Sequence, residues 1–149
     1  YHWLHERLGG TTTLASYGVQ ADPSRRLFNV HADALKAVPH HHLRFLQDCE
    51  TSFFHGPLFF AHAGVRPGVA LRDQTEDDLV WIRNEFSNDT SDHGALVVHG
   101  HTPVDAPLHA GNHVNLDTGA GYGKPLTTAV FEGTTVHVLT AKGRQHLTP

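Results

Sequence analysis

The sequence predicts a mixed α and β fold, of the α/β or α+β class, in a single domain over residues 1–149. Helical patterns fill the first third of the chain, and short apolar runs typical of strands fill most of the rest, with one more helical pattern among them. The 149 residues, 39% of them hydrophobic, suffice for one hydrophobic core and are too few for two.

Helices are predicted where apolar residues recur at helical spacing beside a start or stop signal. Gly9-Gly10 is a stop signal, Pro39 separates two helices, and Thr75 followed by three acidic residues is an N-terminal cap. The predicted helices are Tyr1–Leu8, His31–Val38, His40–Cys49 and a helix that Thr75 opens and that continues through Phe86, with Trp81 and Phe86 at core spacing. Thr11–Tyr17 is predicted to be a β-prone connector, because it is rich in threonine.

Strands are predicted where short runs of aromatic and branched residues lie between turn signals. Gly56-Pro57 and Glu132-Gly133 are such turn signals, and the second is typical of a hairpin. The predicted strands are Ser52–His55, Leu58–Ala61, Leu96–Val98, Val114–Leu116, Leu126–Phe131 and Thr134–Leu139.

Composition excludes several classes of function. The formal charge of −4 leaves no basic stripe, so nucleic acid is not expected as a partner. The longest apolar run, near Leu58–Ala61, is too short to cross a membrane, and no signal-peptide pattern is visible. The single cysteine, Cys49, excludes an internal disulfide and favours a reducing, cytoplasmic location.

Two segments share one pattern that points to metal chemistry. The apolar run ending at Ala61 leads directly to His62, and the run ending at Val98 leads to His99, Gly100 and His101. If the two strands are neighbours, these imidazoles meet at the sheet edge where open sheets usually bind ligands. Neutral imidazole is a good ligand for divalent transition metals. The alternative is that each histidine caps a strand-end carbonyl, and spacing alone does not decide between the two.

Four motifs, in order, resemble the later motifs of calcineurin-like metallophosphoesterases, most of all the bacterial and phage serine/threonine protein phosphatases and the related symmetrical dinucleoside tetraphosphatases. They are Phe60–Pro67 (FAHAGVRP), Asp78–Arg83 (DLVWIR), Val97–Pro103 (VVHGHTP) and Asn115–Ala120 (NLDTGA). Leu8–Gly18 (LGGTTTLASYG) also resembles the family's segment after its Gly-Asn-His-Glu motif. The resemblance implies a four-layer αββα sandwich, of which this chain would be the C-terminal part.

The resemblance also implies a reaction. In that family two divalent metals, most often manganese and otherwise iron, zinc or cobalt, share a bridging hydroxide that attacks phosphorus in line. Carried over by motif, His62 and His101 would bind the same metal, and Arg83 would be the catalytic residue that grips the substrate phosphate. The alternative for Arg83 is a surface arginine paired with Glu76 or Glu85.

Other residues receive weaker assignments. His99 is expected to orient a ligand or contact substrate, with a plain buried histidine as the alternative. Tyr122, in a glycine-flanked loop, is expected to border the active site and contact substrate. Asp117 is expected to close a turn or accept a hydrogen bond from a ligand imidazole. His40-His41-His42 is expected to be a solvated helix start, because consecutive helical residues point in different directions.

The family's first three motifs, Gly-Asp-x-His-Gly, Gly-Asp-x-x-Asp-Arg-Gly and Gly-Asn-His-Glu, do not occur in these 149 residues. The resemblance therefore implies that the missing N-terminal half of the same domain is a partner, that a sheet edge is exposed without it, and that this segment alone is nearly inactive. The predicted function is hydrolysis of phosphoserine and phosphothreonine in proteins. The alternatives are hydrolysis of a dinucleoside polyphosphate, or a degenerate phosphatase fold that only binds; no membrane partner is expected.

Overall fold

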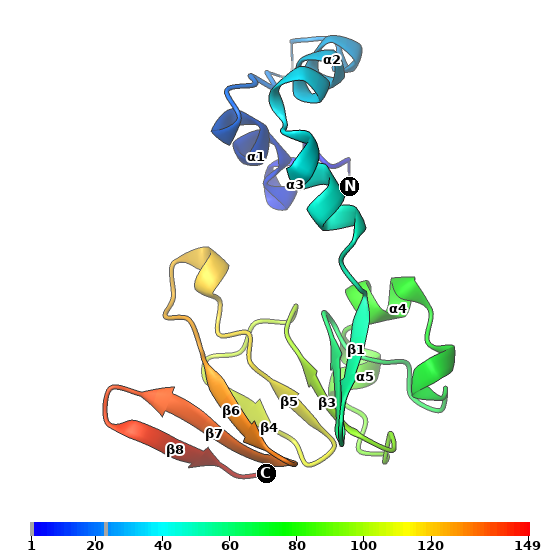
Figure 1. Ribbon diagram of the computed structural model, residues 1–149, viewed down its shortest axis with the longest axis vertical. Helices are drawn as coiled ribbons and strands as arrows, with labels where there is room; N and C mark the ends of the chain where they lie inside the picture. Colours follow the sequence, from blue (N-terminus) through cyan, green and yellow to red (C-terminus); the bar gives the residue numbers. More distant parts are fainter. Residues whose placement is uncertain (1, 23) are drawn as a thin grey trace. The chain divides into compact units, whose positions relative to one another are not determined.

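A computed structural model describes residues 2–22 and 24–149 of the chain (Figure 1). It contains helices and two β-sheets, so the predicted mixed α and β class is confirmed. The chain forms two compact units, Tyr1–Cys49 and Glu50–Pro149, which we describe separately. Whether residues 1–149 belong to one domain stays a prediction. Among the described residues, no helix is long and apolar enough to cross a membrane.

The first unit is helical. Its core is a small cluster of Leu14, Val19 and Val30. Tyr17 Oη and His42 Nδ1, 2.8 Å apart, join the end of the first α-helix to the third, so one histidine of the His40–His42 run has a local partner. The elements are η1 (Glu6–Leu8), α1 (Gly10–Ser16), α2 (Leu27–Ala37) and α3 (His40–Gln47).

Two predictions for this unit are wrong. Thr11–Tyr17 lies mostly in α1 and is not a β-prone connector. The Thr13 hydroxyl donates to the Gly9 carbonyl at 3.0 Å and Leu14 is buried, so local bonding and packing outweigh the low helix propensity of threonine. The predicted helix Tyr1–Leu8 is only the short η1; Tyr1 itself lies outside the described residues. The stop at Gly9 is confirmed by its left-handed φ of 68°.

The second unit is built on a five-stranded sheet, sheet A, of order β1-β2-β3-β5-β4. Strands β2, β3 and β5 are neighbours and parallel, while β1 and β4 pair antiparallel at the two edges. The edge strand β1 leaves Phe53 and Phe54 exposed. The strands are β1 (Ser52–His55), β2 (Leu58–Ala61), β3 (Leu96–His99), β4 (Leu108–His109) and β5 (His113–Asn115).

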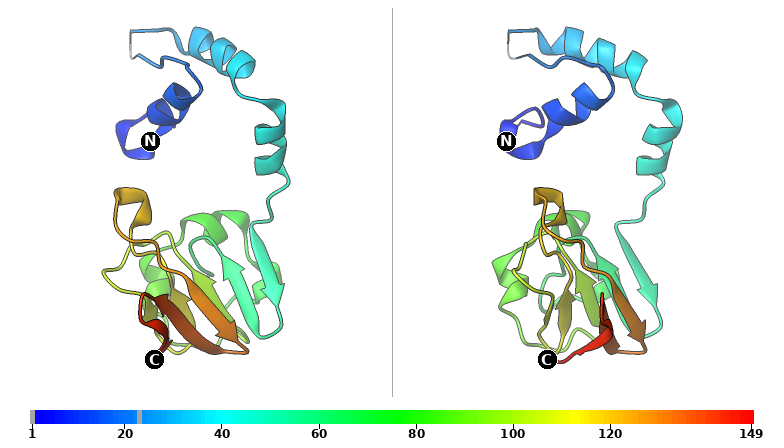
Figure 2. Two further views of the ribbon diagram at one scale, coloured as in Figure 1. Left: turned by 60° about the vertical axis from the view of Figure 1, so that its left-hand side comes forward. Right: turned by 90° about the vertical axis from the view of Figure 1, so that its left-hand side faces the viewer.

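A second, antiparallel sheet lies over one face of sheet A, as Figures 1 and 2 show. Leu58, Leu96 and Val114 of sheet A pack against Val136 of this sheet B. Sheet B comprises β6 (Ala129–Glu132), β7 (Thr135–Thr140) and β8 (Gly143–Leu147). The sequence did not predict β4 and β8, which have no clear apolar alternation, and it placed the start of β6 three residues early.

Short helices cover the other face of sheet A. Phe59 and Val97 of the sheet pack against Leu79, Ile82 and Phe86. These three residues belong to α4 (Glu76–Trp81), its C-cap and α5 (Asn84–Ser87). The unit also contains two one-turn helices in its loops, η2 (Leu71–Asp73) and η3 (Ala120–Tyr122). The unit is therefore layered as helices, sheet A and sheet B.

The predicted helix from Thr75 through Phe86 is correct at its start and wrong in its middle. The Thr75 hydroxyl accepts from the Asp78 amide, which confirms the cap. The helix then stops at Ile82, and Arg83 takes φ −134° and ψ −108°, far from helical values. Ile82 and Phe86, on the two sides of the break, both face the core, where they are 7% and 0% exposed.

Gly64, just after β2, is required by both its backbone and its surroundings. Its φ is +146°, and a Cβ placed on it would lie 2.2 Å from Cδ1 of the fully buried Phe86. No side chain can occupy that space without moving Phe86, so the close approach fixes the turn that follows β2.

We expect Gly64→Ala to lower the free energy of unfolding by about 3 kcal/mol, because the methyl group would overpack against Phe86 in a strained backbone conformation. Urea denaturation would measure this. The matched control is Gly111→Ala, where φ is +89° but a Cβ would meet nothing within 4 Å. Its expected cost is about 1 kcal/mol, from backbone strain alone. Equal costs at the two positions would contradict the role given to Phe86.

Candidate metal and phosphate site

The parallel pairing of β2, β3 and β5 brings three chain segments to one edge of sheet A. His62 follows β2, Gly100 and His101 follow β3, and Asp117 follows β5 by two residues. Backbone bonds continue past the strand ends: Gly100 N donates to His62 O at 2.9 Å, and Leu116 N donates to His99 O at 3.0 Å. The predicted convergence of the two histidine-bearing strand ends is therefore what the structure shows.

His62 and His101 meet directly although 39 residues separate them. His62 Nε2 and His101 Nδ1 are 3.1 Å apart, and the ring centroids are 4.9 Å apart. Two nitrogens that bind one metal at about 2.1 Å each, with an angle of roughly 95–110° between the bonds, lie about 3.1–3.4 Å from one another. The observed spacing fits this, although a single proton shared between the two rings would give the same distance.

Two further features of His101 suit a ligand. His101 has a φ of 65°, the only positive value among non-glycine residues that the structure describes. Such a conformation is uncommon and concentrates at functional sites. Burial, with smaller contributions from the nearby positive charge of Arg83 and from His62, lowers the pKa of His101. A lowered pKa favours the neutral imidazole, which is the form that binds metal.

The residues present fit part of a metal site. Two neutral imidazoles suit manganese, iron, zinc or cobalt, but no group of three or more potential ligands occurs among the described residues. Asp117 does not belong to such a group; its Oδ1 accepts from Gly119 N at 2.9 Å and closes a turn. That turn is one of the two roles expected for Asp117.

Arg83 lies near the two histidines. It is exposed, and its charge is close enough to His101 to lower the pKa of that imidazole. Among the described residues no carboxylate pairs with Arg83; Glu85, one predicted alternative partner, pairs with Arg66 instead. The guanidinium is therefore available to an anion beside the two imidazoles.

Trp81 is a residue that the sequence misplaced. Its spacing predicted a core position, but the side chain is 58% exposed, and its ring meets that of His101 edge to face at a centroid distance of 5.7 Å. The signal for a position near the site was that Trp81 lies two residues before Arg83 in the Asp78–Arg83 motif. Helical spacing favoured a core position and outweighed that signal.

His99 is buried and does not face solvent. It is 5% exposed, and its ring packs against Phe86 and His113 at centroid distances of 4.9 and 5.1 Å. Burial, with a smaller contribution from His113, lowers the pKa of His99 to about 4. This position favours the alternative of a buried histidine over direct contact with substrate.

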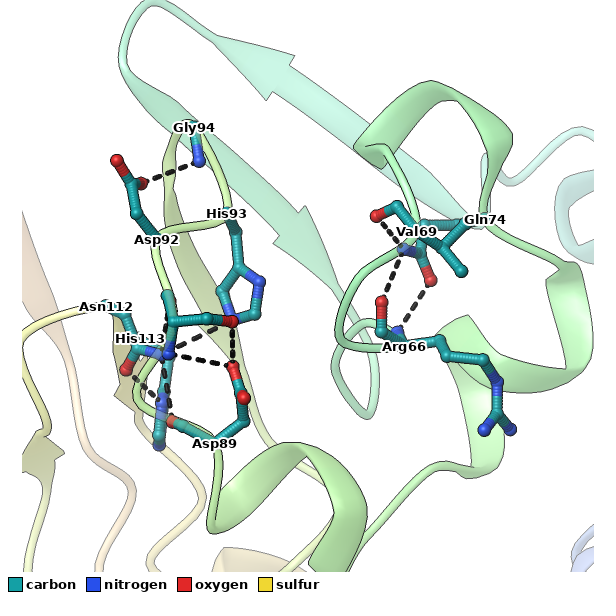
Figure 3. A network of polar contacts seen from close by, with 10 residues as sticks. Arg66, Val69, Gln74, Asp89, Asp92, His93, Gly94, Asn112 and His113 are labelled. Carbon is teal, nitrogen blue, oxygen red and sulfur yellow. Dashed lines mark hydrogen bonds and ion pairs between the residues drawn. The ribbon is translucent and has the colours of Figure 1, made fainter.

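The His99 ring belongs to a larger polar cluster on the helix-covered side of sheet A, part of which Figure 3 shows. His113 Nδ1 lies 2.9 Å from Asn112 Oδ1, and Asn112 Nδ2 donates to the carbonyls of Asp89 and Ser91, both at 2.9 Å. Burial also lowers the pKa values of His93 and His113. The imidazoles of this cluster are therefore neutral at ordinary pH, and they pack behind the sheet edge that bears the site.

Tyr122 is the most exposed aromatic residue described, at 84%. It ends η3, and no hydrogen bond or ring contact joins it to His62, His101 or Arg83 in the part of the chain that the structure describes. Its expected contact with substrate stays a prediction.

Comparison with known proteins gives related sequences and a related solved structure. The chain is 33% identical over 98 residues to the asymmetrical bis(5'-nucleosyl)-tetraphosphatase PrpE of Geobacillus thermodenitrificans, a match that covers 56% of this chain and 40% of that protein. It is 30% identical over 86 residues to the PrpE protein of Anoxybacillus flavithermus, covering 48% of this chain and 35% of that protein. The chain thus spans well under half the length of these curated relatives.

A solved structure shows the same fold. It is the crystal structure of a protein described provisionally as a diadenosine tetraphosphatase, with a TM-score of 0.56 and 21% sequence identity. The likeness covers 89% of this chain and 68% of that one. No protein-family model matches the chain.

The buried histidines predict how stability depends on pH. The pKa of His99 is about 4 in the folded protein and about 6.5 in the unfolded chain, so the unfolded chain binds the proton more readily. The contribution of His99 to the free energy of unfolding is therefore fully present above pH 6.5. It is lost as the pH falls toward 4, which lowers the free energy of unfolding by at most about 3 kcal/mol.

Urea denaturation with a chelator present, at pH 7.5 and pH 5, should therefore give a lower free energy of unfolding at pH 5. His99→Gln should weaken this dependence, while His31→Gln, at an exposed position, should leave it unchanged. A pH dependence that is the same in all three proteins would contradict the assignment to His99.

Proposed function

We propose that the protein containing this chain is a metal-dependent phosphoester hydrolase, with a dinucleoside polyphosphate as its substrate. The observation that carries the reaction class is the 3.1 Å approach of His62 Nε2 to His101 Nδ1 near the guanidinium of Arg83, which has no carboxylate partner among the described residues. Two metal-binding nitrogens next to a phosphate-binding cation form the type of arrangement that phosphoryl transfer needs.

Each residue has a separate task. His62 and His101 would hold one divalent metal through Nε2 and Nδ1, and the metal would polarise the phosphate and supply the nucleophile when bound. Arg83 would bind phosphate oxygens through its planar fork and stabilise the negative charge that develops on them. Gly100 leaves room at the site, because a Cβ there would lie 3.2 Å from that of Asp117.

The proposed substrate differs from the one predicted from sequence. The sequence predicted phosphoserine and phosphothreonine in proteins, and we propose a dinucleoside polyphosphate. The curated relatives are described as dinucleoside tetraphosphatases of the asymmetrical type, and the related solved structure also carries a diadenosine tetraphosphatase description. These descriptions support the dinucleoside polyphosphate alternative. The asymmetrical type also differs from the symmetrical enzymes that the motifs resemble.

Variants at the three site residues should separate metal binding from phosphate binding in the intact, manganese-loaded protein. His62→Ala and His101→Ala should each lose bound metal, together with at least about 100-fold in kcat/KM, because a lost ligand weakens both. Arg83→Ala should lose about 100-fold in kcat/KM and keep its metal. Metal content would be measured by atomic absorption. Equal metal loss in all three variants would show that Arg83 is structural.

Substrate preference should appear in the products. The intact protein should cleave diadenosine tetraphosphate to ATP and AMP, whereas a symmetrical enzyme would give ADP alone. A phosphoserine peptide should be a poorer substrate, with a kcat/KM lower by at least about tenfold. Chromatography of the nucleotides, with His101→Ala as the inactive control, would measure this. A faster reaction with the phosphopeptide would restore the protein phosphatase assignment.

A further inference from the structure

Arg66, in the loop after β2, connects two helices that lie on either side of Arg83. Its Nε donates to Asp78 Oδ2 at 2.9 Å, and its Nη2 donates to the other Asp78 oxygen. Its Nη1 donates to Glu85 Oε2 at 2.8 Å. Asp78 lies on α4 and Glu85 on α5. The guanidinium fork therefore holds both helices at once, which a lysine could not do with the same geometry.

The backbone of Arg66 is fixed as well. Arg66 N donates to Gln74 Oε1 at 2.7 Å, and Gln74 Nε2 donates back to Arg66 O at 3.1 Å and to Val69 O at 2.9 Å (Figure 3). The side-chain amide of Gln74 thus closes the loop on itself. Arg66 is anchored at its main chain before its side chain reaches the two helices.

Asp78, one of the two partners of Arg66, has little freedom. Asp78 is buried and also accepts from the Thr75 hydroxyl at 2.8 Å. The hydrogen bonds from Arg66 hold the pKa of the Asp78 carboxyl below its usual range. The carboxylate therefore stays charged, and the link to α4 persists, throughout the neutral pH range.

Arg83 sits where the chain needs such support. It lies after the last residue of α4 and is the N-cap of α5, where its carbonyl accepts from Phe86 N and Ser87 N while its own φ and ψ are far from helical values. Its own side chain has no carboxylate partner among the described residues. Arg83 therefore lies between two helices that both contact Arg66, through Asp78 of α4 and Glu85 of α5.

From this geometry we propose that Arg66 is the positioning residue for Arg83. It braces α4 against α5 so that the Arg83 guanidinium is presented to a phosphate group beside His62 and His101. This role deepens the proposed function and rests on it. All three side-chain nitrogens of Arg66 donate to Asp78 or Glu85, and these two carboxylates balance its charge, so Arg83 and not Arg66 is the arginine that we assign to the substrate phosphate.

A double-mutant cycle in the intact, manganese-loaded protein tests this role. Arg66→Ala should lower kcat/KM for diadenosine tetraphosphate about tenfold when Arg83 is present, and should have little further effect in an Arg83→Ala background. Arg66→Lys should recover only part of the loss. Metal content should stay unchanged throughout. Equal losses in both backgrounds would overturn the proposal, because they would mean that Arg66 acts independently of Arg83.

The matched control is Arg144→Ala. Arg144 pairs with Glu132 across sheet B, with a distance of 3.0 Å between Nη1 and Oε1, so its loss removes an arginine ion pair away from α4 and α5. It should leave kcat/KM unchanged. If Arg66→Ala does not fold, Glu85→Gln replaces it in the same cycle. Glu85→Gln should lower kcat/KM about threefold when Arg83 is present and should have no further effect in the Arg83→Ala background. A loss from Glu85→Gln that persists in that background would overturn the proposal.

Binding of inorganic phosphate, measured by calorimetry, separates this proposal from the proposed function. Phosphate affinity should fall about tenfold in Arg66→Ala only when Arg83 is present. Should the intact protein hydrolyse neither diadenosine tetraphosphate nor a phosphopeptide, the proposed function fails, while phosphate binding still decides the role of Arg66. Phosphate affinity that is insensitive to Arg66 in an active protein would overturn the positioning role and leave the function intact.

Discussion

The parallel pairing of β2, β3 and β5 is the constraint on which the candidate site depends. Because the three strands run in the same direction, their carboxyl ends lie at one edge, and residues far apart in sequence meet there. Packing on both faces holds the sheet in place, with helices on one side and sheet B on the other. A one-residue slip between β2 and β3 would turn their buried side chains to the opposite faces and separate the imidazoles of His62 and His101.

Phe86 links the sheet edge that bears the site with the layer of helices and buried histidines on one face of sheet A. The ring is fully buried, lies where any side chain at Gly64 would have to go, and contacts the rings of His93, His99 and His113. The histidines on this side have lowered pKa values because they are buried, so they act as neutral aromatic groups at ordinary pH. Phe86 follows Arg83 by three residues, and its amide donates to the Arg83 carbonyl at 3.0 Å. The burial of Phe86 therefore anchors the chain close to Arg83.

Much of the second unit was predictable because its signals are local. The strands around Phe59 and Val97 are short apolar runs between turn residues, and the Thr75 cap is a pattern of a few residues. The helix break at Arg83 was not predictable from periodicity, because Leu79, Ile82 and Phe86 have the spacing of one continuous helix. The backbone path between them depends on how they pack against sheet A. In the first unit, packing of Leu14 made a helix from a segment whose threonines favour a strand. For the site, the motifs pointed to His62, His101 and Arg83, which the structure brings close together, but the contacts of Arg66 and Trp81 are ones that no local pattern contains.

Electrostatics at the sheet edge limits what these residues can do by themselves. His62 and His101 offer a metal two imidazole nitrogens, and the positive charge of Arg83 is near enough to lower the pKa of His101. The same charge repels a divalent cation, and Asp117, the carboxylate whose charge opposes this effect on His101, is engaged in a turn. Two neutral ligands beside a cation bind a dication weakly, so tight binding requires additional anionic ligands. A substrate phosphate is one such anion. Because it interacts favourably with both the metal and Arg83, we expect metal and phosphate to bind with positive cooperativity at this edge, each lowering the electrostatic cost of the other.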